Sequence, residues 1–270
     1  MDSRPIGVFD SGLGGLTALR ELRRILPGEE FVYFGDTARV PYGSKGRETL
    51  VRYSLQDLAF LNSFDPKAIV VACGTVSANA LPELREASAV PVFGVIEPAA
   101  QRAAEGTRNG KIGVIATAAS VRSGAYERAI AALDPALTVI ARPCPLFVPL
   151  VENGRYRRGD KVVELVAEEY LEPFRRDGVD TLVLGCTHYP LLREVIADVM
   201  GPDVTLIDVG AVCAARAAEA LGEAGLLRAA GEGSFRCYVS DTADDFARLA
   251  AIFLGEEGPV PAQQVDIAKF

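Results

Sequence analysis

Residues 182–190 read Leu-Val-Leu-Gly-Cys-Thr-His-Tyr-Pro, an apolar run that ends at Cys186, two residues before His188, the only histidine of the chain. A matching stretch lies upstream, where residues 69–75 read Ile-Val-Val-Ala-Cys-Gly-Thr and the apolar run ends at Cys73. Short apolar runs bounded by turn residues are typical of strands that are buried in a parallel sheet. We therefore expect both cysteines at the carboxyl ends of two such strands.

Strand and helix patterns alternate along the rest of the chain. Strands are expected near residues 6–9, 31–34, 68–72, 91–95, 111–116, 137–141, 180–184, 204–207 and 235–239. Amphipathic helices are expected near 16–26, up to 62, between 73 and 90 with a break at Pro82, near 120–133, 159–175, 190–199 and 209–222, and from 241 to 255. This alternation predicts an α/β fold with parallel sheets.

The two halves of the chain resemble each other. Ile-Gly-Val occurs at 6–8 and again at 112–114, and the two cysteine stretches follow at nearly the same spacing. Landmarks that recur in the same order indicate two related, pseudo-symmetric α/β domains.

The last strand and helix lie beyond the second copy, which indicates that the first domain is discontinuous. We expect it to comprise residues 1–97 and 209–270, around an inner second domain at residues 98–208. Open α/β sheets bind ligands at the carboxyl ends of their strands. Two such domains facing each other would enclose a cleft with one cysteine on each side.

Composition narrows the classes of protein. The net charge of −8 over 270 residues argues against a nucleic-acid partner, because affinity for a phosphate backbone comes from Lys and Arg. No apolar run approaches the roughly 18 residues of a membrane span, and the N-terminal residues do not resemble a signal peptide. The five scattered cysteines fit reduced thiols better than a disulfide framework. We therefore expect a cytoplasmic protein that does not bind membranes.

A single cysteine at a strand end is most often a small buried apolar residue, and this reading suits Cys144, Cys213 and Cys237. Cys73 and Cys186 differ because each precedes a helix start and a threonine. A helix N-terminus beside the sulfur favours the reactive thiolate. One histidine and widely spaced cysteines match no zinc pattern, so we expect no metal.

Two loops offer groups that could bind a ligand. The loop at 10–15, Asp-Ser-Gly-Leu-Gly-Gly, lacks the G-x-G-x-x-G spacing of a dinucleotide site. It places Asp10 and Ser11 at a strand end, beside backbone N–H groups that suit a carboxylate ligand. The stretch Pro-Tyr-Gly at 41–43 is either a plain turn or a place where the tyrosine hydroxyl and the glycine N–H project over the cleft.

Two thiols on opposite faces of a ligand suit the inversion of a stereocentre. One thiolate removes a proton from one face while one thiol returns a proton to the other, and the roles exchange with direction. A general base supplies only about 10²–10⁴-fold in rate, so fixed hydrogen-bond donors must stabilise the developing charge. Backbone N–H groups, Thr75 and Thr187 are candidates for these donors.

Five motifs together resemble one family. They are D-S-G-L-G-G at 10–15, Y-F-G-D-T-A-R-V-P-Y-G at 33–43, C-G-T-V-S-A at 73–78, V-E-N-G at 151–154 and G-C-T-H-Y-P at 185–190. The set, spread from residue 6 to about residue 210, resembles the glutamate racemases of the cofactor-independent aspartate/glutamate racemase superfamily. The resemblance implies an isomerase that interconverts L- and D-glutamate without a cofactor. It also implies a role in supplying D-glutamate for bacterial peptidoglycan synthesis, and so in cell-wall biogenesis and cell shape.

The resemblance also implies roles for individual residues. Cys73 and Cys186 would be the two acid/base residues, assisted by Asp10, Glu152 and His188. The substrate would be held by Asp10, Ser11, Pro41, Tyr42, Gly43, Gly74, Thr75, Thr117 and Thr187.

Position 74 departs from the family pattern, which usually has Asn where this chain has Gly74. The missing amide leaves open a racemase of aspartate or of another small acidic amino acid. We expect Gly74→Asn to tighten glutamate binding if the backbone there accepts a side chain. A non-catalytic two-domain binding protein for an anionic ligand is a rival, although binding alone needs no pair of thiols. A pyridoxal-phosphate enzyme is disfavoured because no lysine is positioned for a Schiff base, and the sequence leaves open whether the chain forms a homodimer.

Overall fold

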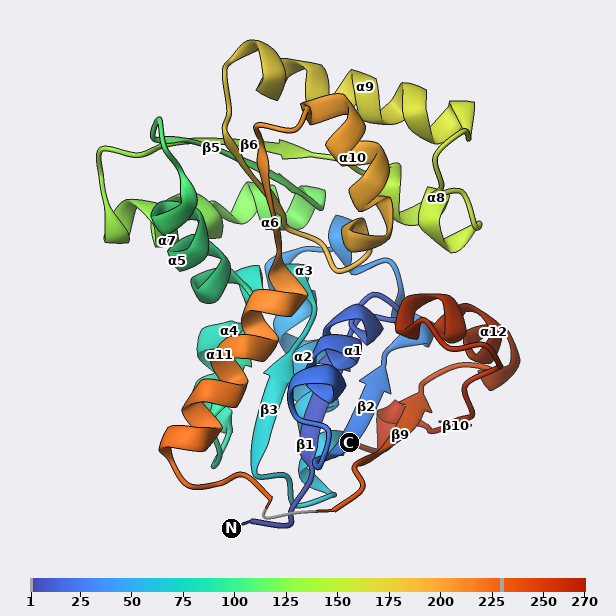
Figure 1. Ribbon diagram of the computed structural model, residues 1–270. Coiled ribbons are helices and arrows are strands. Elements are labelled where there is room, and N and C mark those ends of the chain that lie inside the picture. The colour runs from blue at the N-terminus through green and yellow to red at the C-terminus, as the bar shows by residue number, and fades with distance from the viewer. Residues whose placement is uncertain (1, 229–230) are drawn as a thin grey trace.

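The computed structural model describes residues 2–228 and 231–270, so that of the expected domain ranges only Met1 and residues 229–230 fall outside the description. Two parallel sheets lie in two lobes, one above the other in Figure 1. All strand pairs in both sheets are parallel, which confirms the expected fold class.

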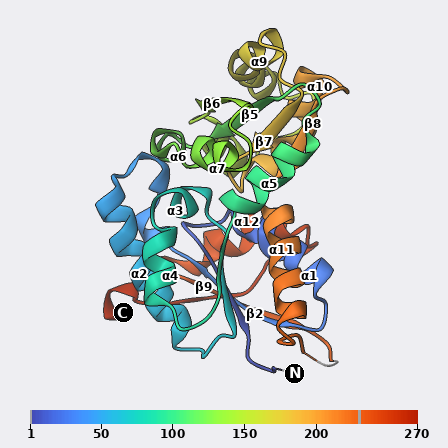
Figure 2. The same ribbon diagram turned by 90° about the vertical axis from the view of Figure 1, so that its left-hand side faces the viewer.

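The larger sheet has the strand order β10-β9-β2-β1-β3-β4. Its strands are β1 (Ile6–Asp10), β2 (Glu30–Gly35), β3 (Ala68–Val71), β4 (Val92–Gly94), β9 (Ser234–Val239) and β10 (Ala262–Gln264). Its helices are α1 (Leu16–Ile25), α2 (Arg47–Asn62), α3 (Gly74–Asn79), α4 (Leu81–Ala87), α11 (Val209–Glu223) and α12 (Ala243–Leu254). Helices α2 and α4 lie on one face, and α1 and α11 pack together on the other (Figure 2).

The smaller sheet has the order β6-β5-β7-β8. Its strands are β5 (Lys111–Ala116), β6 (Thr138–Pro143), β7 (Thr181–Leu184) and β8 (Thr205–Asp208). The helices around it are α5 (Ile96–Gly106), α6 (Ala118–Ser123), α7 (Ala125–Leu133), α8 (Phe147–Glu152), α9 (Lys161–Arg176) and α10 (Arg193–Met200). Short 3₁₀ turns complete the chain: η1 (Thr37–Arg39), η2 (Tyr42–Ser44), η3 (Tyr189–Leu192) and η4 (Ile267–Lys269).

The central strands form the core because their residues are apolar on both faces. All residues of β1, β3 and β7 are buried, as expected for parallel strands covered on both sides by helices. The carboxyl ends of these strands lie at the junction of the two lobes, where α3 and α6 contact each other (Figure 1).

Some elements differ from the sequence-based expectations. The single helix expected at 120–133 is two helices, because Gly124 adopts the left-handed conformation with φ of +64° and ends α6. Helices α5 and α8 and strand β10 were not expected. The break expected at Pro82 occurs as the boundary between α3 and α4, with the proline in the first turn of α4.

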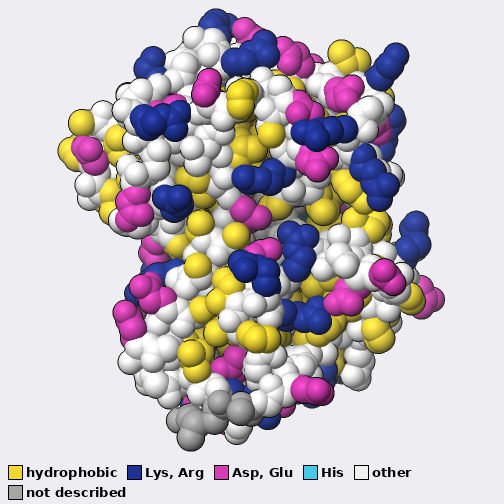
Figure 3. Space-filling view, viewed as in Figure 1, with side chains coloured by type: hydrophobic (Ala, Val, Ile, Leu, Met, Phe, Trp, Pro, Cys, Tyr) yellow, Lys and Arg dark blue, Asp and Glu magenta, His cyan; other side chains and the backbone are white. Residues whose placement is uncertain are grey.

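The surface is mixed in charge. Basic and acidic side chains are interspersed over the face shown in Figure 3. In the described parts of the chain, residues 2–228 and 231–270, no helix is both long and apolar enough to cross a bilayer.

Candidate active site

The ends of β3 and β7 carry the two cysteines to the junction of the lobes. Cys73 follows β3 with extended backbone angles (φ −75°, ψ 119°) and is the residue from which α3 starts. Cys186 follows β7 and precedes the 3₁₀ turn η3. Both side chains are buried, with 4% and 7% of their surface exposed. A thiol pair at these positions is shielded from bulk water.

The two strand ends touch through glycines. A Cβ atom added to Gly74 would lie 2.5 Å from the carbonyl oxygen of Gly185. A Cβ atom on Gly185 would in turn lie 2.8 Å from the carbonyl oxygen of Ile115. This backbone contact brings the residues next to the glycines, Cys73 and Cys186, to opposite sides of one junction. The tighter glutamate binding expected of Gly74→Asn was conditional on a backbone that accepts a side chain, and here a side chain at position 74 would require the Gly185 carbonyl to shift.

Cys186 lies beside a histidine–carboxylate pair. Its Sγ is 3.8 Å from Nδ1 of His188, whose Nε2 is 2.9 Å from Oε1 of Glu152 at the end of α8. Burial alone lowers the pKa of His188, but the hydrogen bonds to Cys186 and Glu152 outweigh it and raise the pKa to about 10. The imidazole is therefore charged at neutral pH and places a positive charge where a Cys186 thiolate would form.

Cys73 has a different environment. Its thiol is 3.6 Å from Oγ of Ser11, to which it donates. Burial raises the pKa of Cys73 to about 12, and the nearby Asp10 carboxylate adds to this rise. Cys73 is thus a neutral thiol at neutral pH, the form that can give a proton.

Asp10 connects the two sides of the site. One of its oxygens accepts the N–H of Gly12 at 2.9 Å, and the other lies 3.5 Å from the hydroxyl of Thr187. The carboxylate is buried at the end of β1. It therefore contacts both the 10–15 loop and the turn that carries Cys186.

Two threonines meet on the other side of the junction. The hydroxyls of Thr75 and Thr117 lie 2.9 Å apart, and Thr117 also caps α6 by accepting the N–H of Ser120. A Cβ atom on Gly43 would lie 2.9 Å from Cβ of Thr117, so the 41–43 loop reaches the second lobe here. Thr75, Thr117 and Gly43, which the family resemblance assigns to substrate binding, are thus brought together.

The Tyr42 hydroxyl does not project over the cleft. Tyr42 is buried, its hydroxyl donates to Asp36, and it lies 3.3 Å from Oδ2 of Asp57. Arg39 pairs with both carboxylates, at 2.5 Å and 2.8 Å. The Tyr42 side chain therefore anchors the 41–43 loop to the protein interior. Only the backbone of this loop, which is exposed at Pro41, remains to contact a ligand.

This buried cluster was not expected from the sequence. Asp36 and Arg39 stand inside a quoted motif, but Asp57 lies on α2 and nothing local connects it to them. A carboxylate on a mostly apolar helix face was the one available signal, since buried charges need partners.

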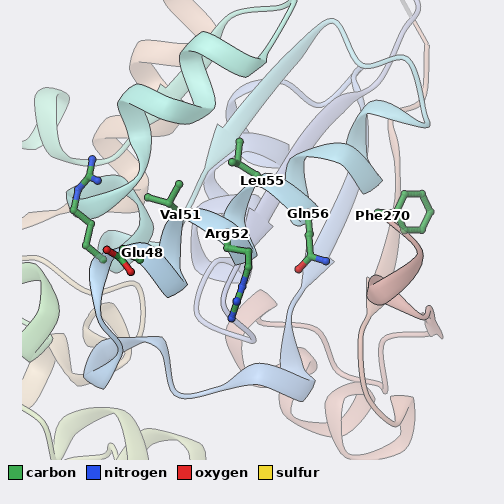
Figure 4. Close-up of a pocket in the computed structure, with 7 residues that line it drawn as sticks. Glu48, Val51, Arg52, Leu55, Gln56 and Phe270 are labelled. Atoms are coloured by element: carbon green, nitrogen blue, oxygen red, sulfur yellow. The ribbon is translucent and has the colours of Figure 1, made fainter.

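Other features of the surface lie apart from the thiols. A pocket of about 540 Å³ on α2 is lined by Arg47, Glu48, Val51, Arg52, Leu55, Gln56 and Phe270 (Figure 4). It contains none of the expected site residues. Within the part of the chain that the structure describes, no three His, Cys, Asp or Glu side chains gather in a way that could hold a metal ion.

Known proteins resemble this chain in sequence and in fold. The family model for Asp/Glu/Hydantoin racemase matches residues 6–217. A glutamate racemase of Geobacter metallireducens is 50% identical over 256 residues, covering 94% of each chain. A glutamate racemase isoform of Bacillus anthracis superposes with a TM-score of 0.93 at 38% identity, over 98% of both chains. The glutamate racemase of Francisella tularensis, solved with D-glutamate, gives 0.92 at 39% identity over the whole of both chains.

These matches span nearly the full chain and include both cysteine-bearing strand ends. They favour an enzyme over the binding-protein alternative. The chain belongs to the glutamate racemase family, within the Asp/Glu/Hydantoin racemases, and is an isomerase of the amino-acid racemase class.

Proposed function

We propose that this racemase interconverts L- and D-glutamate by proton transfer at Cα between Cys73 and Cys186. The observation that carries the proposal is the contact of Gly74 with Gly185, which holds the two cysteine-bearing strand ends against each other. Relatives that match over nearly their whole length are named glutamate racemases, and the structure of one of them contains D-glutamate. The proposed reaction uses no cofactor.

The two cysteines lie in different electrostatic environments. His188, with a pKa of about 10, supplies a positive charge beside Cys186, whereas Cys73 stays protonated. In one direction the Cys186 thiolate takes the α-proton, and the Cys73 thiol gives its proton to the opposite face of Cα. The product leaves with inverted configuration, Cys186 as thiol and Cys73 as thiolate. The opposite enantiomer then runs the same step in reverse.

The charge that develops on the substrate needs donors fixed in advance. We assign the α-carboxylate to the hydroxyls of Thr75 and Thr187 and to the N–H groups at the start of α3. The Thr75 hydroxyl lies beside that of Thr117 and the Thr187 hydroxyl beside Asp10, which supports this assignment. We assign Ser11, Thr117 and the backbone of Pro41, Tyr42 and Gly43 to substrate binding as well. Asp10 is suited to the substrate ammonium group, because its carboxylate is buried between both halves of the site.

We also propose that the chain divides into domains at 1–97 with 209–270 and at 98–208. Each range holds one of the two sheets, which supports the division. The cellular role we propose is the supply of D-glutamate for peptidoglycan in the cytoplasm.

Incubation with L-glutamate in D₂O tests substrate and reaction together. We expect loss of optical rotation with incorporation of one α-deuterium, and the same from D-glutamate. L-Aspartate at equal concentration serves as the matched control for the shorter acidic side chain. Faster racemisation of aspartate than of glutamate would refute the proposed substrate.

A further inference from the structure

The hydroxyl of Thr17 joins two parts of the chain that are far apart in sequence. Thr17 is the second residue of α1 and is buried, with 1% of its surface exposed. Its Oγ1 lies 2.9 Å from the carbonyl oxygen of Gly14 and 2.9 Å from that of Thr187. The Gly14 carbonyl already accepts the backbone N–H of Thr17 at 3.0 Å. We therefore assign the single hydroxyl proton to the hydrogen bond with the carbonyl oxygen of Thr187, the residue next to Cys186.

The Thr187 carbonyl lacks the hydrogen-bond donor that its own turn supplies to the neighbouring carbonyls. In the turn after β7, the N–H of Tyr189 donates to Cys186 and that of Leu191 donates to His188, each three residues back. The residue three after Thr187 is Pro190, which has no N–H. A buried carbonyl without a partner is costly. The Thr17 hydroxyl fills this gap from the other lobe.

Gly14 allows the turn to sit this close to α1. A Cβ atom there would overlap the Thr187 hydroxyl and lie 2.5 Å from Nδ1 of His188. The backbone at 14–17 thus forms the surface on which the Cys186 turn rests. Cys73, by contrast, is held by β3, in the same sheet as β1 from which this loop leads.

We infer that Thr17 is a positioning residue for Cys186, an inference that rests on the proposed two-thiol function. The Thr17 hydroxyl acts on the Thr187 carbonyl, and through it fixes the Cys186 turn against the lobe that carries Cys73. Proton transfer depends on the placement of the reacting atoms, and a misplacement of about 1 Å can cost about 100-fold in rate. Loss of this one hydrogen bond should therefore slow the steps in which Cys186 takes part and leave Cys73 in place.

The test compares Thr17→Val, which keeps the branched shape but loses the hydroxyl, with Thr17→Ser, which keeps the hydroxyl. We expect kcat of Thr17→Val to fall about tenfold, with KM changed less than about threefold, and Thr17→Ser to recover most of the loss. The specific readout is the primary isotope effect of α-deuterated glutamate in each direction. It should rise in the direction in which Cys186 is the base and fall in the other. A general loss of folding would not separate the two directions.

Two results would overturn the inference: wild-type kcat with unchanged isotope effects in Thr17→Val, or equal losses in the Val and Ser variants. If Thr17→Val does not fold, Thr17→Ala replaces it against Thr17→Ser. Cys73→Ala and Cys186→Ala are measured alongside. Activity in those variants would refute the two-thiol function itself, whereas inactive cysteine variants beside a normal Thr17→Val would refute only the positioning role.

Discussion

The backbones of Gly74 and Gly185 are in close contact, so that a Cβ atom added to Gly74 would lie 2.5 Å from the Gly185 carbonyl oxygen. Each glycine is adjacent to one of the two cysteines, so this contact sets how closely the two strand ends approach. A main-chain carbonyl at the end of a buried strand cannot turn aside as a flexible side chain could. A side chain at position 74 would therefore increase the distance between the two strand ends that carry the thiols.

We expect Gly74→Ala to lower kcat by about tenfold or more. The added Cβ would push the two strand ends apart, and a misplacement of about 1 Å at the reacting groups can cost about 100-fold in rate. Gly74→Asn should behave in the same way and should not lower KM. Gly46→Ala is the matched control, since an added Cβ there meets nothing within 4 Å. Steady-state kinetics decide the outcome. Unchanged kcat with lower KM in Gly74→Asn would show that the junction opens without cost.

His188 gives a direct view of the site because it is the only histidine in the chain. Its imidazole should give a single NMR titration curve near pH 10 rather than near 6.5. Since folding raises this pKa, the stability contributed by the charged ring is complete below about pH 6.5 and is lost as the pH rises through about 10.

In Glu152→Gln the same curve should move to lower pH, because one of the hydrogen bonds that raise the pKa loses its charge. Glu164→Gln, a substitution at an exposed position of α9, serves as control. A wild-type midpoint between pH 6 and 7 would show that His188 is neutral in the working enzyme.

Tyr42→Phe separates an anchoring role from a substrate contact. Removal of the hydroxyl takes a hydrogen-bond donor from the buried Asp36. It also removes the contact of Tyr42 with Asp57, whose carboxylate keeps its ion pair with Arg39. Burial and the neighbouring Asp36 already raise the pKa of Asp57. We expect a loss of about 1–3 kcal/mol in the free energy of unfolding, measured by denaturant titration.

Tyr53→Phe is the control for this variant, since its ring lies 5.8 Å from that of Tyr42 between centroids and is only partly buried. Its stability should change much less. A Tyr42→Phe variant of normal stability but raised KM would instead support a hydroxyl that contacts the substrate.

The sequence was enough to predict the parallel sheets and the positions of both cysteines, because these follow from local signals. An apolar run, a cysteine and a helix start lie within a few residues at both Cys73 and Cys186. Helix α5 was not recognised, although its alanines favour a helix and Pro98 is tolerated in a first turn. Its buried face is made mostly of alanines, so the pattern of large apolar residues is weak, and the helix packs against α7 and α11.

Contacts between distant segments could not be predicted. The burial of the Tyr42 hydroxyl beside Asp57 depends on how the 41–43 loop packs against α2. The pairing of Thr17 with Thr187 depends on how the lobes meet. Gly124 is an intermediate case: a glycine inside a helical pattern is a signal for a break, but the tertiary fold decides that it adopts a positive φ.

The most direct test of the two-thiol reaction is the rate of racemisation in Cys73→Ala and Cys186→Ala, with Cys237→Ala as a control at another buried cysteine. The rates are followed by optical rotation from both L- and D-glutamate, and folding is checked by circular dichroism. We expect each of the first two variants to be folded and to retain less than about a hundredth of the wild-type rate, the usual contribution of a general base, while Cys237→Ala stays active. A folded Cys73→Ala or Cys186→Ala enzyme that racemises glutamate above that level would contradict the mechanism.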